Sequence, residues 1–272
     1  MKTGIKLVLN LFEQEKSDST KKILDDFGGL DALIGYCSEN LDGAEISAVR
    51  INTDPDFVFD TVISLENAGL HITIHGTLNS DITGEMFFAP YKKLLESGKL
   101  SHTLNITVHP LKTEDETTDI LRGIVEYIDS VGYNVRITLE NQRNKSEATV
   151  FAGCMGVKRI VKKINHPRLR LCFDFGHRMS NVKKEMQPFD AIDDEFFSLT
   201  SHTHIHSYFE GRTHFPLNLG ETALHENIST LKKYGYDEMY LLELMPERYP
   251  DDIPIKDSYT ESIRILNDAI EK

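Results

Sequence analysis

The chain has 272 residues, of which 40% are apolar, and its 43 acidic and 30 basic side chains give a formal net charge of −13. This length and apolar fraction are sufficient for one large core, and an α/β barrel typically needs about 250 residues. The acidic excess argues against a nucleic-acid partner, because affinity for phosphate backbones comes largely from Lys and Arg.

The cysteines and the apolar runs bear on the compartment. Cys37, Cys154 and Cys172 are odd in number and form no CxxC pair, which is typical of reduced thiols. Lys6 and Asn10 interrupt the first apolar stretch, so we expect no signal segment, and no apolar run approaches the ~20 residues of a membrane span. We therefore expect a soluble, cytoplasmic protein without a membrane partner.

Strand-like and helix-like segments alternate along the chain. The segments with the apolar character of buried strands are residues 5–11, 44–51, 70–75, 104–109, 135–140, 170–174, 199–206 and 239–243. The segments with helical periodicity or composition are residues 21–27, 29–40, 56–68, 81–98, 114–131, 147–163, 222–234 and 258–270. We expect Ser19 or Thr20 to cap the first helix, a mixed and partly helical stretch after residue 174, and a long loop after residue 206.

This alternation predicts the fold class. Strands that alternate with helices favour a parallel sheet, and eight such units favour a closed (β/α)8 TIM barrel of the α/β class. No linker, repeat or low-complexity segment divides the chain. The sequence therefore predicts a single domain over residues 1–272.

Residues suited to metal binding recur at the carboxyl ends of the predicted strands, where the active sites of such barrels lie. From the third strand onward, the residues at or just after these ends are His75, His109, Glu140, Asp174, His177, His204, His206, His214 and Glu243. A lone acid at such a position is more often a helix cap or a solvated loop residue. Their recurrence, and their mixture of oxygen and nitrogen ligands, instead indicates one site for a divalent metal.

Two of these carboxylates stand in apolar surroundings. Glu140 ends the stretch VRITLE, and Glu243 ends YLLE. An unpaired buried carboxylate costs several kcal/mol, so we expect a cation beside each of them. His202, His204 and His206 share one strand face, and we expect one or two of them to reach the metal while the rest orient their neighbours.

Together these residues resemble the xylose isomerase-like superfamily of TIM barrels, which includes sugar isomerases and epimerases and the endonuclease IV-like proteins (AP endonuclease family 2). The motifs that carry the resemblance are LEN, FDFGH, HIHSY and LLEL. In the isomerase and epimerase branch, one divalent metal is held by Glu, Asp, His and Glu. The resemblance places these roles on Glu140, Asp174, His204 and Glu243.

The endonuclease IV-like branch holds additional zinc ions. Its first extra site matches His75 and His109, which would share Glu140, and its third site would use His177 and His214. The chain departs from that branch in the loop after the seventh strand, where Arg212 stands at the position of an Asp. Arg212 could instead bind an anionic group of the substrate, as an alternative to exposed loop charge, and His206 is a second candidate substrate-binding residue.

Three functions are open on these grounds. The favoured one is a metal-dependent isomerase or epimerase, or a related lyase, that acts on a sugar or sugar phosphate through an enediolate, with Glu140 and Glu243 moving the proton. The alternative is a zinc-dependent phosphoesterase of the endonuclease IV type, acting at abasic sites or on a small phosphoester. The third is a non-enzymatic barrel that only binds an ion or ligand. The imidazoles favour zinc or manganese over magnesium or cobalt.

Overall fold

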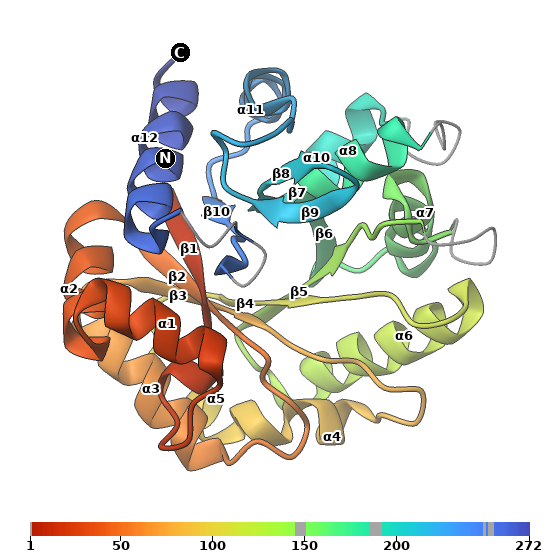
Figure 1. Cartoon of the computed structure of the whole chain (residues 1–272). Helices are drawn as coiled ribbons and strands as arrows, with labels where there is room; N and C mark the ends of the chain where they lie inside the picture. Colours follow the sequence, from red (N-terminus) through yellow and green to blue (C-terminus); the bar gives the residue numbers. More distant parts are fainter. Residues whose placement is uncertain (1, 145–150, 185–191, 247–248, 250–252) are drawn as a thin grey trace.

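The computed structural model of the protein describes residues 2–144, 151–184, 192–246, 249 and 253–272 (Figure 1). Eight parallel strands close into a barrel in the spatial order β1-β10-β7-β6-β5-β4-β3-β2. The barrel strands are β1 (Lys2–Val8), β2 (Gly43–Ser47), β3 (His71–His75), β4 (Leu104–Val108), β5 (Val135–Glu140), β6 (Leu169–Asp174), β7 (Thr200–Ile205) and β10 (Met239–Leu242). The predicted (β/α)8 barrel, a single domain, is confirmed.

Helices cover the outside of the barrel (Figure 1). The α-helices are α1 (Asp18–Phe27), α2 (Leu30–Asn40), α3 (Pro55–Asn67), α4 (Gly84–Phe88), α5 (Lys92–Glu96), α6 (Glu114–Val131), α7 (Cys154–Ile164), α8 (Phe175–Lys183), α10 (Asp194–Leu199), α11 (Leu224–Lys233) and α12 (Ile255–Glu271). Two 3₁₀ turns accompany them, η1 (Leu9–Leu11) and η2 (Ala89–Tyr91). No helix among the described residues is long and apolar enough to cross a membrane.

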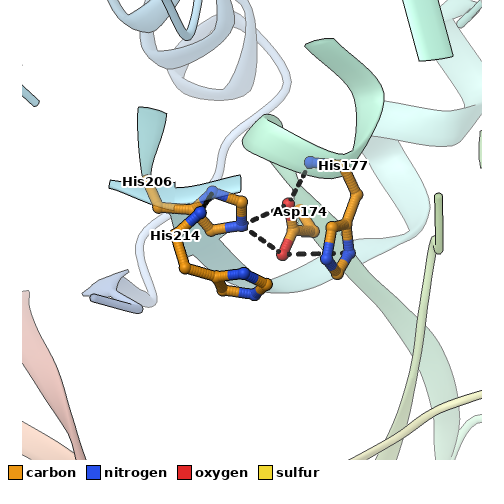
Figure 2. Close-up of side chains that lie close together, drawn as sticks. All are labelled: Asp174, His177, His206 and His214. Carbon is orange, nitrogen blue, oxygen red and sulfur yellow. Dashed lines mark hydrogen bonds and ion pairs between the residues drawn. The ribbon is translucent and has the colours of Figure 1, made fainter. Parts of the chain in front are cut away.

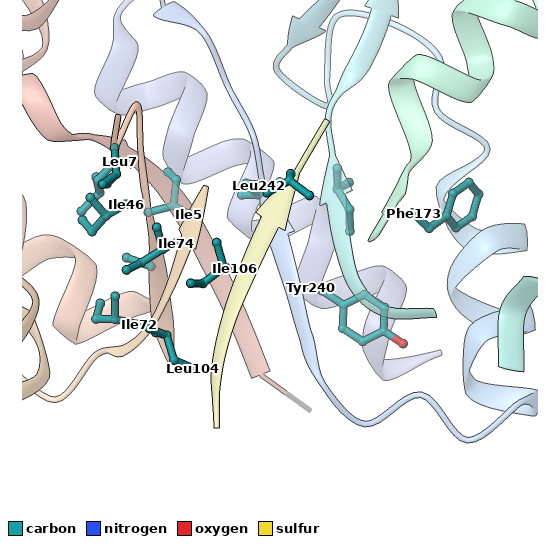
Figure 3. Close-up of a cluster of buried hydrophobic side chains, with 14 of the residues drawn as sticks. Ile5, Leu7, Ile46, Ile72, Ile74, Leu104, Ile106, Phe173, Tyr240 and Leu242 are labelled. Atoms are coloured by element: carbon teal, nitrogen blue, oxygen red, sulfur yellow. The ribbon is translucent and has the colours of Figure 1, made fainter. Parts of the chain in front are cut away.

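The strands alternate between an apolar face and a polar face. Ion pairs join Glu45 on β2 to His204 on β7, and Lys6 on β1 to Glu243 after β10. Because β2 and β7 are not neighbours in the sheet, the first of these pairs crosses the barrel interior. The intervening residues point toward the helices and form the hydrophobic core, with Ile5, Ile46, Ile74, Ile106 and Leu242 among those drawn in Figure 3. The barrel interior is thus unusually polar, and it carries the site.

Several predicted boundaries were wrong for identifiable reasons. Residues 81–98 do not form one helix, because Pro90 cannot donate a helical hydrogen bond and the chain forms η2 between α4 and α5. Residues 9–11 form η1 instead of extending β1. The cap of α1 is Ser17, whose side chain accepts a hydrogen bond from the Thr20 backbone N–H, so the predicted caps Ser19 and Thr20 were both wrong.

The stretch after β7 is also more ordered than the long loop that we expected. It contains a hairpin of β8 (Ser207–Phe209) and β9 (Arg212–Phe215), in which Phe209 pairs with Arg212. The two turn residues, Glu210 and Gly211, both have positive φ, as the tightest hairpin turns require. Helix α7 begins at Cys154, later than predicted, and the predicted helical residues 147–150 lie outside the described part of the chain.

Candidate metal centre

The structure brings the predicted ligands together from neighbouring strands at one end of the barrel. Glu140 and Asp174 are the final residues of β5 and β6, His204 lies near the end of β7, and Glu243 directly follows β10. All four are at most 2% exposed. Parallel strands deliver their carboxyl ends to the same rim, which is why residues far apart in sequence meet here.

One nitrogen of the His204 imidazole lies close to two carboxylates. Its Nδ1 atom is 2.9 Å from Glu140 Oε2 and 3.1 Å from Glu243 Oε2. Neither contact has hydrogen-bond geometry: His204 Nδ1 and Glu243 Oε2 are both buried without a hydrogen-bond partner among the described residues. Buried polar atoms normally have a hydrogen-bond partner. Unpaired oxygen and nitrogen atoms that lie close together are therefore the arrangement expected of a cation site.

Glu140 connects this point to a second group of imidazoles. Its Oε2 atom lies 3.2 Å from Nε2 of both His75 and His109. Its Oε1 atom accepts a hydrogen bond of 2.6 Å from Gln142 and lies 3.1 Å from Nδ1 of His177. The ligand atoms of His75, His109 and Glu140 are all within 4.8 Å of one another, which is close enough to hold an ion.

Asp174 is the centre of a third group, drawn in Figure 2. Its Oδ1 atom accepts a hydrogen bond of 2.6 Å from the backbone N–H of His177, and the ring of His177 lies 3.3 Å from Oδ2. Asp174, His177, His206 and His214 place ligand atoms within 4.8 Å of one another. Since His177 Nδ1 is close to both Asp174 and Glu140, it links this group to the other two.

The hydrogen bonds of His206 fix which of its nitrogens carries a proton. Its Nδ1 accepts a hydrogen bond of 2.9 Å from the backbone N–H of His214, so the proton of the neutral ring is on Nε2. Nε2 therefore donates to Asp174, at 3.0 Å. His206 thus orients Asp174.

His214 reaches its position with a left-handed backbone, at φ 71°. This conformation costs energy for a residue other than Gly, and it clusters at functional sites.

The charges of these groups are set by burial and by each other. Burial alone would raise the pKa of Glu140, but the nearby imidazoles of His109 and His204 outweigh it and hold that pKa well below its usual value. Lys6 and His204 do the same for the pKa of Glu243. For Asp174 burial prevails and raises the pKa to about 8. Burial would lower the pKa of His204, but the surrounding acidic groups raise it well above its usual value.

A cleft of about 1410 Å³ opens onto the group. Its polar lining includes Lys6, His75, His177, His214 and Glu243. Within the described chain, the lining does not include Glu140, Asp174 or His204, so these lie behind that surface. Imidazoles in the lining of the cleft therefore cover a deeper layer of carboxylates, and Glu243 belongs to the lining and to that layer.

The donors present fit a divalent metal. They combine carboxylate oxygens with imidazole nitrogens, as Zn²⁺ and Mn²⁺ prefer, and they include the unpaired buried atoms of His204 and Glu243. The two predicted substrate-binding residues do not line the cleft. Arg212 is exposed at the start of β9, His206 is fully buried, and neither is among the described residues that line the cleft.

Sequence reasoning missed two residues of the barrel interior, Lys6 and Glu45. Lys6 lines the cleft and forms an ion pair with Glu243, while Glu45 is fully buried and contacts His202 and His204. Each is a charged residue inside an apolar strand, IKLVL and AEISAV. That is the same signal that singled out Glu140, so applying it along whole strands, beyond their ends, would have found both.

Comparison with known proteins identifies the family. The sequence profile described as xylose isomerase-like TIM barrel matches residues 64–269, most of the chain. The chain belongs to the xylose isomerase-like TIM barrel family. A curated relative, an uncharacterised protein of Methanocaldococcus jannaschii, is 25% identical over 178 residues, which cover 62% of each chain.

Several solved structures share the fold. A xylose isomerase domain protein of Alicyclobacillus acidocaldarius superposes with a TM-score of 0.64 at 12% identity, covering 99% of this chain and 98% of that one. The IolI protein with a bound zinc atom gives 0.63 at 17% identity, covering 100% and 98%. An L-ribulose 3-epimerase gives 0.60 at 12%, covering 99% and 94%. At these identities the likeness establishes the fold alone.

Proposed function

We propose that the protein is a metal-dependent isomerase or epimerase, or a related lyase, that acts on a sugar or sugar phosphate. The observation that carries the proposal is the pair of buried carboxylates, Glu140 and Glu243, whose oxygens lie 2.9 Å and 3.1 Å from His204 Nδ1; Glu243 also lines the cleft. Structural likeness supports it, because an L-ribulose 3-epimerase and a zinc-containing IolI protein have the same fold.

Glu140, Asp174, His204 and Glu243 would hold the ion, with zinc or manganese favoured by the imidazoles over magnesium or cobalt. A bound divalent ion would acidify the C–H between the two oxygens of a hydroxy-ketone. The chain's own contribution is proton transfer. Glu243 lines the cleft, and the ammonium group of Lys6 helps to keep it ionised and able to accept a proton.

Solvent exchange tests this proposal. Incubation in deuterated water with free and phosphorylated ketoses and aldoses should place deuterium on one substrate carbon. Glu243→Gln should abolish the exchange while most of the metal stays bound, because an amide oxygen still ligates weakly but accepts no proton. The exposed Glu39 on α2 provides a matched control, and Glu39→Gln should exchange at the normal rate. Absence of exchange with every sugar would count against the proposal.

A second candidate, a zinc-dependent phosphoesterase, is supported by the His75–His109–Glu140 group. These residues could hold a second ion beside the first, and two ions about 3.5–4 Å apart are typical of phosphoester hydrolysis. Elemental analysis separates the two candidates. One metal per chain favours the isomerase. Two or more zinc ions per chain favour the hydrolase, provided that the count falls by one when His75 and His109 are both replaced by Ala. Cleavage of abasic-site DNA would support the latter directly.

A further inference from the structure

Glu45 is a fully buried carboxylate on a strand that supplies none of the predicted metal ligands. It lies in the middle of β2 with no exposed surface, between the apolar residues Ala44 and Ile46. Burying a charge in a barrel is costly unless it is paired and hydrogen-bonded. The reason for a glutamate here must therefore lie in what it contacts.

Its contacts reach across the barrel to two histidines of β7. Glu45 Oε2 lies 3.0 Å from Nε2 of His202 and 3.2 Å from Nε2 of His204, both with hydrogen-bond geometry. Its other oxygen, Oε1, is 3.1 Å from the same Nε2 of His204 and is buried without a hydrogen bond of its own. The carboxylate thus holds the His204 ring by one nitrogen.

The opposite nitrogen of that ring faces the proposed metal. His204 Nδ1 is the atom that lies 2.9 Å from Glu140 and 3.1 Å from Glu243. A carboxylate accepts hydrogen bonds but donates none, so the Nε2 atom that faces Glu45 carries the proton. With Nε2 protonated, Nδ1 is the nitrogen whose lone pair is available to an ion.

We propose that Glu45 is a positioning residue: its carboxylate fixes the orientation and tautomer of His204, so that Nδ1 is presented to the metal between Glu140 and Glu243. The inference rests on the proposed metal-dependent function and deepens it. Metal-binding histidines commonly donate their second N–H to a carboxylate, and losing that partner typically weakens metal binding about 10–100-fold. His202 then has a separate role, since it supplies a second N–H to Glu45 and helps to compensate its buried charge.

Zinc affinity of the isosteric variant Glu45→Gln tests this. The metal-free protein is titrated with zinc in competition with a chromophoric chelator, beside wild type and the surface control Glu39→Gln. We expect the dissociation constant to rise about 10–100-fold for Glu45→Gln and to stay unchanged for the control. Equal affinity in wild type and Glu45→Gln would overturn the role of Glu45 and leave the proposed function intact. If wild type bound neither zinc nor manganese in the same titration, the proposed function itself would fail, and this inference with it.

Nuclear magnetic resonance of zinc-loaded wild type tests the same point without a variant. In protein labelled with ¹⁵N at histidine, the Nδ1 signal of His204 should shift on zinc binding, while Nε2 keeps a slowly exchanging proton. A zinc-bound Nε2 would overturn the inference. So would Glu45→Gln protein that holds one zinc fewer per chain with unchanged affinity for the rest, because Glu45, His202 and His204 would then form a metal site of their own.

Discussion

The ring of His206 lies where a methyl group on residue 176 would stand. A Cβ atom at Gly176 would be 2.0 Å from both Nδ1 and Cε1 of that ring, far inside contact distance. The glycine in FDFGH is therefore a steric requirement: helix α8 can begin against the ring only if residue 176 has no side chain. The ring in turn holds Asp174 by a hydrogen bond of 3.0 Å.

Gly176→Ala should therefore push His206 away from Asp174. We expect a loss of about 1–3 kcal/mol in the free energy of unfolding, as overpacking typically causes, together with weaker zinc binding. Gly123 in α6 is the matched control, because a Cβ atom there would meet nothing within 4 Å. Gly123→Ala should stabilise the protein by up to about 1 kcal/mol, since Ala favours helix over Gly. Urea denaturation and zinc titration measure both; equal behaviour of the two variants would contradict the steric account.

The pKa values of the site predict how metal binding depends on pH. The pKa of Asp174 is about 8 and that of His204 is raised well above its usual value, so near neutral pH both groups hold a proton when no metal is bound. An ion bound there must displace these protons, while Glu140 and Glu243, whose pKa values are lowered, are already ionised. Zinc affinity should therefore rise with pH, and binding should release protons.

Calorimetry measures that release. Titrations at neutral pH in buffers with different ionisation enthalpies give the number of protons displaced per zinc, and we expect more than one. Affinity that stays constant between roughly pH 6 and pH 9 would show that neither Asp174 nor His204 gives up a proton to the ion.

Some residues of the site could be read from the sequence and others could not. Glu140, Asp174 and Glu243 were found because a charge at the end of an apolar strand is a local signal. The partnership of Glu45 with His204 has no such signal, since these residues are 159 positions apart and meet only across the closed barrel. The tautomer of His206 also depends on a contact from a hairpin that the sequence did not reveal.

At the scale of elements, α1 shows how a cap is chosen by its surroundings. Ser17, Ser19 and Thr20 are all suitable caps by composition. In the folded chain Asn10 accepts hydrogen bonds from the Ser17 backbone N–H, at 2.8 Å, and from the Thr20 hydroxyl, at 2.9 Å. These bonds from η1 fix the start of the helix at Ser17, a tertiary effect that no local pattern contains.

The assignment of Ser17 as the cap of α1 can be tested by measuring the free energy of unfolding. Ser17→Ala should lower the free energy of unfolding by about 1 kcal/mol, because the Thr20 backbone N–H loses its acceptor. Ser19→Ala, inside the first turn, should change it by less than about 0.5 kcal/mol. Urea denaturation of the two variants decides between the caps; a larger loss for Ser19→Ala would restore the original prediction.

Alternation of strands and helices was predictable because it is written in local periodicity, as in α6 and β5, whose predicted limits agree with the structure. The break at Pro90 and the hairpin turn at Glu210 and Gly211 were not predicted, although a proline marks the first and a glycine marks the second. Both breakers act locally, so these two features could have been predicted by counting Pro90 as a helix break and Gly211 as a turn residue.

For the whole molecule, the polar barrel interior implies that stability depends on what the site holds. Four carboxylates, Glu45, Glu140, Asp174 and Glu243, are buried there. A bound cation offsets part of their mutual repulsion, and any ligand that binds only the folded state stabilises it. A bound metal ion should therefore contribute substantially to the stability of the folded state.

Zinc at about 100 times its dissociation constant should add about 2.7 kcal/mol to the free energy of unfolding relative to protein in chelator. Thermal and urea denaturation with and without zinc measure this, with calcium, which prefers all-oxygen sites, as the control ion. Equal midpoints with zinc and with chelator would mean that zinc does not bind the folded state in preference to the unfolded chain.

The pairing of β1 with β10 has a consequence for synthesis of the protein. These strands close the barrel, and the ion pair of Lys6 with Glu243 joins them across the seam. During translation β1 emerges before the other barrel strands, and β10 follows only after about 230 further residues. Until then β1 presents an open edge on that side, a template for mispairing with other chains. Nascent chains stalled before β10 should therefore be the species most dependent on chaperones.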